Sequence, residues 1–160
     1  MARQLVIVES PAKARTINRY LGSRYTVKAS MGHIRDLPRK ELGVDIENDF
    51  RPRYALIPEK KRVVNELQEH ARKAEAVFLA ADPDREGEAI CWHLAALLKT
   101  HNSRIYRVLL HEITKKAVTE AFQNLGDLDQ EKIEAQQTRR ILDRLVGYLI
   151  SPLLWRKIGR

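Results

Sequence analysis

The sequence predicts an α/β fold in which a mostly parallel sheet is flanked by helices and is followed by a helical segment. Short apolar runs alternate with helical patterns over residues 4–125, as in βαβ units joined by right-handed connections. The runs 4–9 and 76–81 are largely apolar, which is typical of parallel strands covered on both faces. From Asp129 onward only a helical period remains.

Each predicted element rests on its own pattern or end signal. Strand patterns occur at residues 4–9, 25–30, 53–57, 76–81 and 104–110. Helical patterns occur at residues 11–21, 60–73, 86–98, 115–125 and from 129 onward. Ser10 and Thr114 are placed to cap the first and fourth helices, and Gly22 is placed to end the first. Residues 31–38, punctuated by glycine and proline, are expected to form a loop, and residues 39–51 show no clear period.

Size and charge limit the classes of function. The 160 residues suffice for one domain with a sizeable core. The chain has 29 Lys and Arg against 21 Asp and Glu, and this net charge of +8 favours a polyanionic partner such as nucleic acid, although it also serves solubility. A single cysteine, Cys91, excludes an internal disulfide and fits a reducing compartment. The sequence shows neither a signal-peptide pattern nor a long apolar stretch, so we expect a cytoplasmic protein with no membrane partner.

Three acids, Asp82, Asp84 and Glu86, follow the apolar run 76–81 at every second position, and we call residues 82–86 the acidic turn. In an extended backbone the first two face one point, and Glu86 joins them from the next helix. Two carboxylates about 4 Å apart repel by roughly 4 kcal/mol at an effective dielectric constant of about 20, so a cation is expected between them. Oxygen ligands alone suit Mg²⁺. The same acids also fit a plain helix start, with Asp84 as the N-cap.

Glu9 ends its predicted strand just as Asp82 follows its own. Because the carboxyl ends of parallel strands meet at one edge of the sheet, Glu9 is expected to join the acids as a fourth carboxylate. Lys13, one helical turn beyond Glu9, is placed to direct a positive charge at a phosphate over that edge. On spacing alone, a solvated lysine between neighbouring arginines fits this position better.

Other polar residues lie on the 31–38 loop and on the last helix. His33 and Arg35 could contact a substrate phosphate or base from the loop, although lone loop histidines are more often surface residues. One side of the last helix is apolar and is expected to pack, through Ile141, Leu142, Leu145, Val146 and Leu149. The opposite side is polar and basic and suits either a phosphate backbone or solvent, through Gln136, Gln137, Arg140, Arg144 and Gly147.

Several common site motifs do not occur in the sequence. It has no G-x-x-x-x-G-K, no G-x-G-x-x-G and no G-x-S-x-G, which disfavours a P-loop, a dinucleotide site and a nucleophilic serine. An acidic metal site beside basic contacts remains, and it suits chemistry on a phosphodiester, with the metal screening charge.

Four stretches together resemble the N-terminal part of bacterial DNA topoisomerase I, a type IA enzyme. They are Leu5-Val-Ile-Val-Glu9-Ser-Pro-Ala-Lys13, Gly32-His33-Ile-Arg-Asp-Leu-Pro38, Asp82-Pro-Asp84-Arg85-Glu86-Gly-Glu88 and Ala135-Gln-Gln-Thr-Arg139-Arg140-Ile-Leu-Asp143-Arg144. The glutamate plus D-x-D-x-E arrangement is the toprim signature, which bacterial primases share more loosely. The resemblance implies a toprim, Rossmann-like domain over residues 1–127 and the truncated start of a neighbouring helical domain over residues 128–160.

The resemblance also implies roles for residues. Glu9 would act as general acid and base at the cleaved phosphodiester, Lys13 would position or protonate the same phosphate, and Mg²⁺ would be held by Glu9, Asp82, Asp84 and Glu86. The resemblance would place His33, Arg85, Arg139, Asp143 and Arg144 in contact with DNA or in support of the site, and the loop and helix patterns add Arg35 and Arg140. Such enzymes act in the bacterial cytoplasm, at the nucleoid, and relax negatively supercoiled DNA by transient cleavage and passage of a single strand.

The family's nucleophilic tyrosine has no counterpart in this sequence. It sits in a Thr-Tyr-x-Arg-Thr-Asp-like context, which surrounds none of Tyr20, Tyr25, Tyr54, Tyr106 and Tyr148. We therefore expect the chain alone to bind magnesium, and DNA weakly, without cutting or relaxing it; the remaining domains of the parent protein would be its partners. Two alternatives remain: the toprim domain of a primase or nuclease, and a non-catalytic DNA-binding module whose acids only cap a helix.

Overall fold

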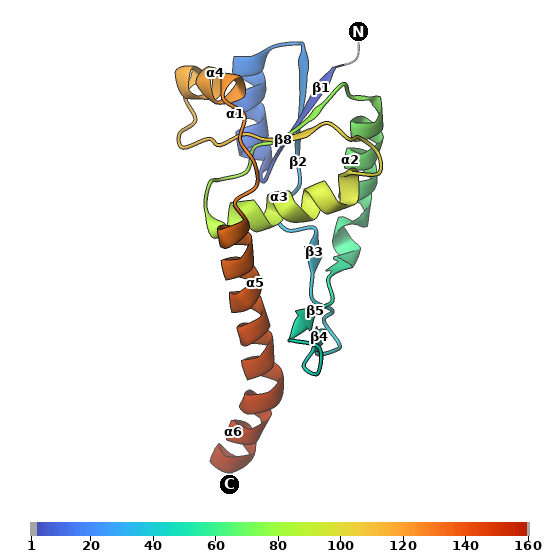
Figure 1. Ribbon diagram of the computed structural model, residues 1–160, viewed down its shortest axis with the longest axis vertical. Coiled ribbons are helices and arrows are strands. Elements are labelled where there is room, and N and C mark those ends of the chain that lie inside the picture. Colours follow the sequence, from blue (N-terminus) through green and yellow to red (C-terminus); the bar gives the residue numbers. More distant parts are fainter. Residues whose placement is uncertain (1–2, 160) are drawn as a thin grey trace.

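A four-stranded parallel sheet forms the centre of the computed structural model, which describes residues 3–159 (Figure 1). Its order is β2-β1-β7-β8. The strands are β1 (Gln4–Val8), β2 (Tyr25–Ala29), β7 (Val77–Leu79) and β8 (Ile105–Arg107). Adjacent strands are all parallel, with Leu5 beside Val77 and Leu79 beside Arg107. The predicted α/β fold class is therefore confirmed.

Helices cover both faces of this sheet. On one face α1 (Pro11–Leu21) and α4 (Lys115–Gln123) pack with side chains such as Val6 and Phe78. On the other face α2 (Lys61–Lys73), preceded by a 3₁₀ turn at Pro58–Lys60, and α3 (Arg85–Leu98) pack on Ile7 and Leu79. The alternating directions of side chains along each strand thus divide the core into two clusters, as expected of strands buried on both faces.

Two small antiparallel ladders lie below α3, outside the central sheet (Figure 1). One pairs β3 (Arg35–Asp36) with β6 (Ala55–Leu56), and the other pairs β4 (Val44–Asp45) with β5 (Arg51–Pro52). The strand predicted at 53–57 is thus shortened to two residues and lies in a separate ladder. The segment 31–38, which was predicted to be a loop, contains β3. This strand was not predicted because two residues are too few to show an alternating pattern.

The helix ends follow their caps. The side chains of Ser10 and Thr114 accept hydrogen bonds from the third backbone N–H of α1 and α4, at 3.3 and 3.1 Å, as predicted. Asp129 caps α5 in the same way, through the Lys132 N–H at 3.2 Å. Since α5 begins at this cap, the domain boundary predicted near residue 127 falls in the connection between α4 and α5. The division into two domains remains a prediction.

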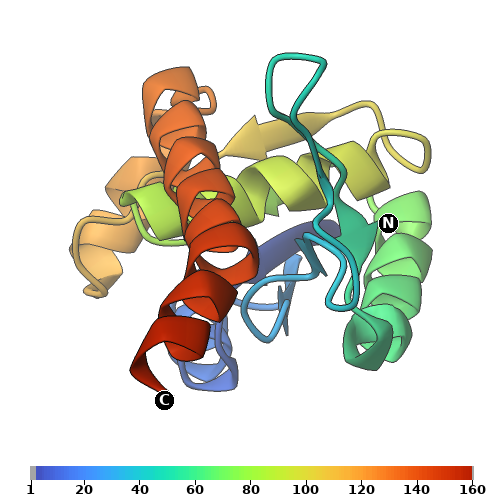
Figure 2. The same cartoon turned by 90° about the horizontal axis from the view of Figure 1, so that it is seen from below.

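The last helices are α5 (Gln130–Leu145) and α6 (Ser151–Ile158), joined by a π-helical turn at Val146–Ile150. They run downward from one end of α3, and the view from below shows α5 opposite the 31–57 segment (Figures 1 and 2). Among the described residues no helix has the length and apolar character needed to cross a bilayer.

The structure reverses the predicted packing of α5. Along α5 and the π-helical turn after it, Leu142 and Leu149 of the predicted apolar stripe are 55% and 47% exposed and Ile141 and Leu145 are half-buried, whereas Gln136 is buried. The polar side packs because the 36–42 segment beside it presents a carboxylate and several backbone carbonyls, which need hydrogen-bond donors. A helical period identifies a stripe but not the neighbour that will cover it.

Candidate functional site

The carboxyl ends of β1 and β7 bring Glu9, Lys13 and Asp82 together, as the sequence predicted for this edge of the sheet. The Lys13 ammonium donates to Asp82 Oδ1 at 2.5 Å and also to Glu9 Oε1. Glu9 directly follows β1, Asp82 follows β7, and Lys13 lies in the first turn of α1, which Ser10 caps. We call these three residues the acid–lysine cluster.

Electrostatics within this cluster favour the charged lysine. Partial burial lowers the pKa of Lys13, but hydrogen bonds to Asp82 and Glu9 outweigh it, so the pKa lies above its ordinary value. Lys13 therefore carries a fixed positive charge at neutral pH. Its three N–H donors can satisfy two carboxylates and still present a hydrogen to an anion above the sheet edge.

The other two acids of the turn have different partners. Asp84 is the N-cap of α3, accepting from the Gly87 N–H at 2.7 Å, which is the helix-cap role that the sequence also allowed. Glu86 Oε2 lies 2.8 Å from Nε2 of His33. Among the described residues no three His, Cys, Asp or Glu side chains lie close enough together to hold a metal ion. Each acid therefore already has a hydrogen-bond partner in the chain: Lys13 for Glu9 and Asp82, the Gly87 N–H for Asp84, and His33 for Glu86.

The donors nevertheless fit a hard cation. Glu9 Oε2 is buried and has no hydrogen-bond partner among the described residues, which is costly for a carboxylate oxygen. The available ligands are carboxylate oxygens only, the set that Mg²⁺ prefers. The ammonium of Lys13 already occupies a position between two of these carboxylates, so a positive charge is stable there.

Arg35 is held beside the acidic turn by aromatic neighbours. Its Nε donates to Nδ1 of His93 at 2.9 Å, and its guanidinium lies 5.2 Å from the Trp92 ring. His93 is 2% exposed, and burial first, then the charges of Arg35 and His33, lower its pKa to about 3. His93 is therefore neutral and structural.

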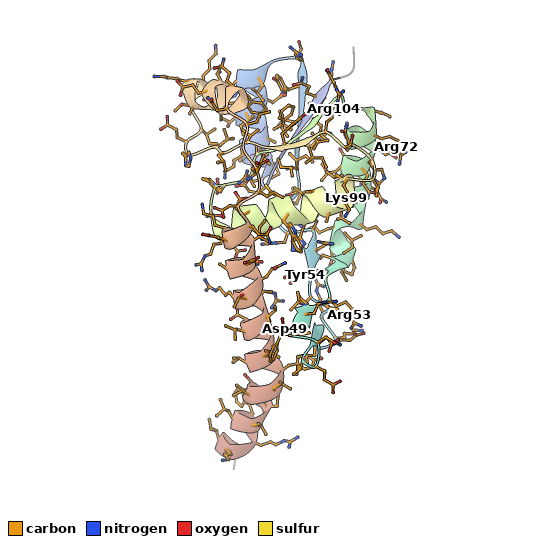
Figure 3. The ribbon with its side chains drawn as sticks, viewed as in Figure 1. Asp49, Arg53, Tyr54, Arg72, Lys99 and Arg104 are labelled. Atoms are coloured by element: carbon orange, nitrogen blue, oxygen red, sulfur yellow. The ribbon has the colours of Figure 1, made fainter. Side chains whose placement is uncertain are left out.

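A pocket of about 220 Å³ lies between these residues and α5. Its lining includes His33, Arg35, Tyr54, Gln136, Arg139 and Arg140. Figure 3 shows Tyr54 below α3, on the side of the β4–β5 hairpin. The Tyr54 hydroxyl and Gln136 Oε1 are buried without a hydrogen-bond partner among the described residues, and burial raises the pKa of Tyr54 to about 12. The lining also includes the carboxylates of Asp36, Glu86 and Asp143, so the pocket combines three arginines and three acids with unsatisfied polar groups inside.

Two arginines of α5, Arg140 and Arg144, contact the protein itself. Arg140 forms a bidentate pair with Asp36, at 2.8 and 3.0 Å. Burial raises the pKa of Asp36, but hydrogen bonds from Arg140 and the Leu37 N–H outweigh it and leave the pKa below its ordinary value. Arg144 donates to the carbonyls of Pro38, Glu41 and Leu42. The other predicted DNA-contacting residues of this group are exposed: Arg85, Arg139 and Asp143.

Sequence reasoning missed a buried ion pair behind the acidic turn. Glu88 and Arg107 have side chains 1% exposed and lie 2.7 Å apart. Glu88 stands one helical turn before Cys91 on the buried face of α3, and an acid at such a position signals a buried cation nearby. Arg107 lies in a strand between an aromatic and an apolar residue, and this position was the corresponding sign of a buried cation.

Comparison with known proteins places these features in a family. The model of the Toprim domain family matches residues 4–113. The solved structure of full-length topoisomerase I from Thermotoga maritima is similar, with 49% sequence identity and a TM-score of 0.86 over 95% of this chain. This chain spans only 26% of that protein. The predicted resemblance is thus confirmed. Because the family match includes all four strands of the central sheet, the chain belongs to the Toprim domain family.

Proposed function

We propose that this chain is the toprim portion of a type IA DNA topoisomerase, an enzyme that relaxes negatively supercoiled DNA by transient single-strand cleavage and passage. The observation that carries the proposal is the acid–lysine cluster at the carboxyl edge of the sheet, which combines a proton carrier with a fixed positive charge. The likeness to the Thermotoga maritima topoisomerase supports it. The cellular location that goes with a DNA substrate is the cytoplasm.

In this proposal Glu9 and Lys13 act directly at the phosphodiester. A tyrosine from another domain would attack phosphorus and become linked to the 5′-phosphate, while the 3′ oxygen leaves and needs a proton. Glu9, whose buried oxygen has no hydrogen-bond partner among the described residues, is the group to take the phenolic proton of the tyrosine and pass it to the 3′ oxygen, and to reverse this transfer on religation. Lys13 would hold a phosphate oxygen and offset its charge.

Magnesium would be held by Asp82, Asp84 and Glu86, with Glu9, and would screen the phosphate charge when bound. The contacts in the chain indicate what the ion must compete with. Asp84 would have to share its oxygens with the N-terminus of α3, and Glu86 with His33. We therefore expect weak, DNA-assisted binding of the metal by the isolated chain.

DNA would approach along the rim of the pocket, where His33, Arg35 and Arg139 stand near the acidic turn. Arg85 would contact the backbone from the start of α3. Arg140 and Arg144 would reach DNA only after exchanging their present contacts with Asp36 and with the loop carbonyls. Without the nucleophilic tyrosine, the chain alone would bind DNA but neither cleave nor relax it, and the remaining domains of the parent protein would complete the site.

A magnesium titration of the purified chain tests the metal site. Asp82→Asn and Asp84→Asn should each reduce Mg²⁺ affinity measured by calorimetry, whereas Glu120→Gln, on the exposed face of α4, should not. If all three variants bind like the unaltered chain, the acids do not form a metal site. The alternative favoured by the Asp84 cap, a DNA-binding module whose acids only start a helix, would then hold.

A DNA-binding measurement tests the other half of the proposal. Arg139→Ala should weaken binding of a labelled single-stranded oligonucleotide, and Arg72→Ala, away from the pocket near the end of α2, should have a smaller effect (Figure 3). Relaxation of a supercoiled plasmid by the chain alone would refute the expectation that the nucleophile lies elsewhere. Primer synthesis or DNA hydrolysis would favour the primase or nuclease alternative.

A further inference from the structure

We propose that the buried pair of Glu88 and Arg107 is a positioning device that holds the acidic turn in the place where Asp82 meets Lys13. The pair is fully enclosed, and Nε and Nη2 of Arg107 donate to Glu88 Oε1 at 2.9 and 2.7 Å. Two buried charges are often replaceable by apolar side chains without loss of stability. Stability alone therefore does not account for this arrangement, and its other contacts indicate what it does.

Arg107 also binds the backbone where β7 leaves the sheet. Its Nη1 donates to the carbonyls of Leu79 at 3.0 Å and Ala81 at 2.8 Å, and its Nη2 donates to the carbonyl of Asp82 at 2.9 Å. The same Nη1 reaches Val108 in its own segment. A guanidinium is planar, with donors at fixed angles, so these carbonyls are fixed relative to one another and to β8.

The first turn of α3 approaches the same Asp82 carbonyl. A Cβ atom added at Gly87 would lie 1.9 Å from the Asp82 carbonyl oxygen, so the first turn of the helix touches this peptide directly. The guanidinium and the helix thus both contact the Asp82 carbonyl oxygen, and together they set the direction in which the Asp82 side chain leaves the backbone. In that direction its Oδ1 lies 2.5 Å from Lys13.

The same device reaches the start of α5. Glu88 Oε2 accepts from the backbone N–H of Asp129, the N-cap of that helix, at 3.1 Å. Lys132 donates to the carbonyl of Pro83 at 2.7 Å. Glu88 and Lys132 thus link α5 to the acidic turn, so the position of α5 bears on the position of Asp82.

Two variants of the 160-residue chain test the positioning role. Arg107→Lys keeps the charge beside Glu88 but loses the planar set of donors. Glu88→Leu combined with Arg107→Met removes both charges at similar volume and should therefore fold. In both variants we expect faster amide hydrogen exchange at residues 82–87 than in the unaltered chain. We also expect Mg²⁺ affinity to be weaker by about tenfold or more. This second expectation rests on the proposed metal site.

Val118→Ala is the matched control, because Val118 is buried in the core cluster on the other face of the sheet. It should lower global stability while leaving metal affinity and the relative protection of residues 82–87 unchanged. A folded double variant with unaltered protection of residues 82–87 overturns the proposal, as does full rescue by Arg107→Lys. If the unaltered chain binds no Mg²⁺, the metal part of the proposed function fails, and the exchange measurement still decides the positioning role.

Discussion

The acidic turn and the 31–57 segment both carry residues expected at the site, but they are held in place by different means. The acidic turn leaves a buried parallel strand, and its backbone is bound by Arg107 from β8. The 31–57 segment has only two-residue ladders and is held by side chains of other elements, such as Arg140 on Asp36. The first region owes its geometry to the sheet, whereas the second depends on α5 and on aromatic neighbours.

The largest effect should come from breaking the support of the acidic turn. Arg107→Ala leaves the Glu88 carboxylate buried without its cation and should lower the free energy of unfolding by about 3–5 kcal/mol, measured by urea denaturation. Lys116→Ala, on the exposed surface of α4, should change it little. If Arg107→Ala lowered the free energy of unfolding as little as Lys116→Ala does, the Glu88–Arg107 pair would not be important for stability.

Acid should next weaken the region of His93. The unfolded chain takes up this proton near pH 6.5, but the folded chain only near pH 3, because burial and the neighbouring cations disfavour the imidazolium. Stability should therefore fall as the pH decreases, by about 3 kcal/mol between pH 6.5 and pH 4 from this group. His93→Gln, which keeps an acceptor for Arg35, should flatten that part of the stability profile. An unchanged slope would show that His93 titrates normally.

The two roles of Asp84 can be separated by a pair of substitutions. Asp84→Ala removes the cap of α3 and should cost about 1 kcal/mol of stability, whereas Asp84→Asn keeps a capping oxygen and should cost much less. Magnesium affinity should decrease in both, since both remove the carboxylate charge. Equal unfolding midpoints for the two variants would argue against the cap.

The smallest expected effect concerns the rim of the pocket. Arg139→Ala should reduce the slope of log affinity for single-stranded DNA against log salt by about 0.7, the value for one phosphate contact. Asn124→Ala, after α4, should leave the slope unaltered. An unchanged slope in Arg139→Ala would place the DNA elsewhere on the surface.

The sequence predicted those parts of the molecule whose causes are local. The strands of the sheet, the caps Ser10 and Thr114, and the meeting of Glu9 with Asp82 follow from apolar runs, end signals and the shared edge of parallel strands. The partner of Glu86 could not be predicted, because His33 is distant in the sequence and its loop has no period. The outward face of α5 depends on what packs beside it, which no helical pattern contains.

The close approach at Gly87 has a consequence for engineering. Alanine is favoured over glycine inside a helix by about 1 kcal/mol, so a design guided by helix propensity would replace this residue. Here the nearest backbone oxygen leaves no room for even a methyl group. A saturation library at position 87, selected for folding, should thus return glycine alone, and stabilisation of α3 has to be sought on its solvent side.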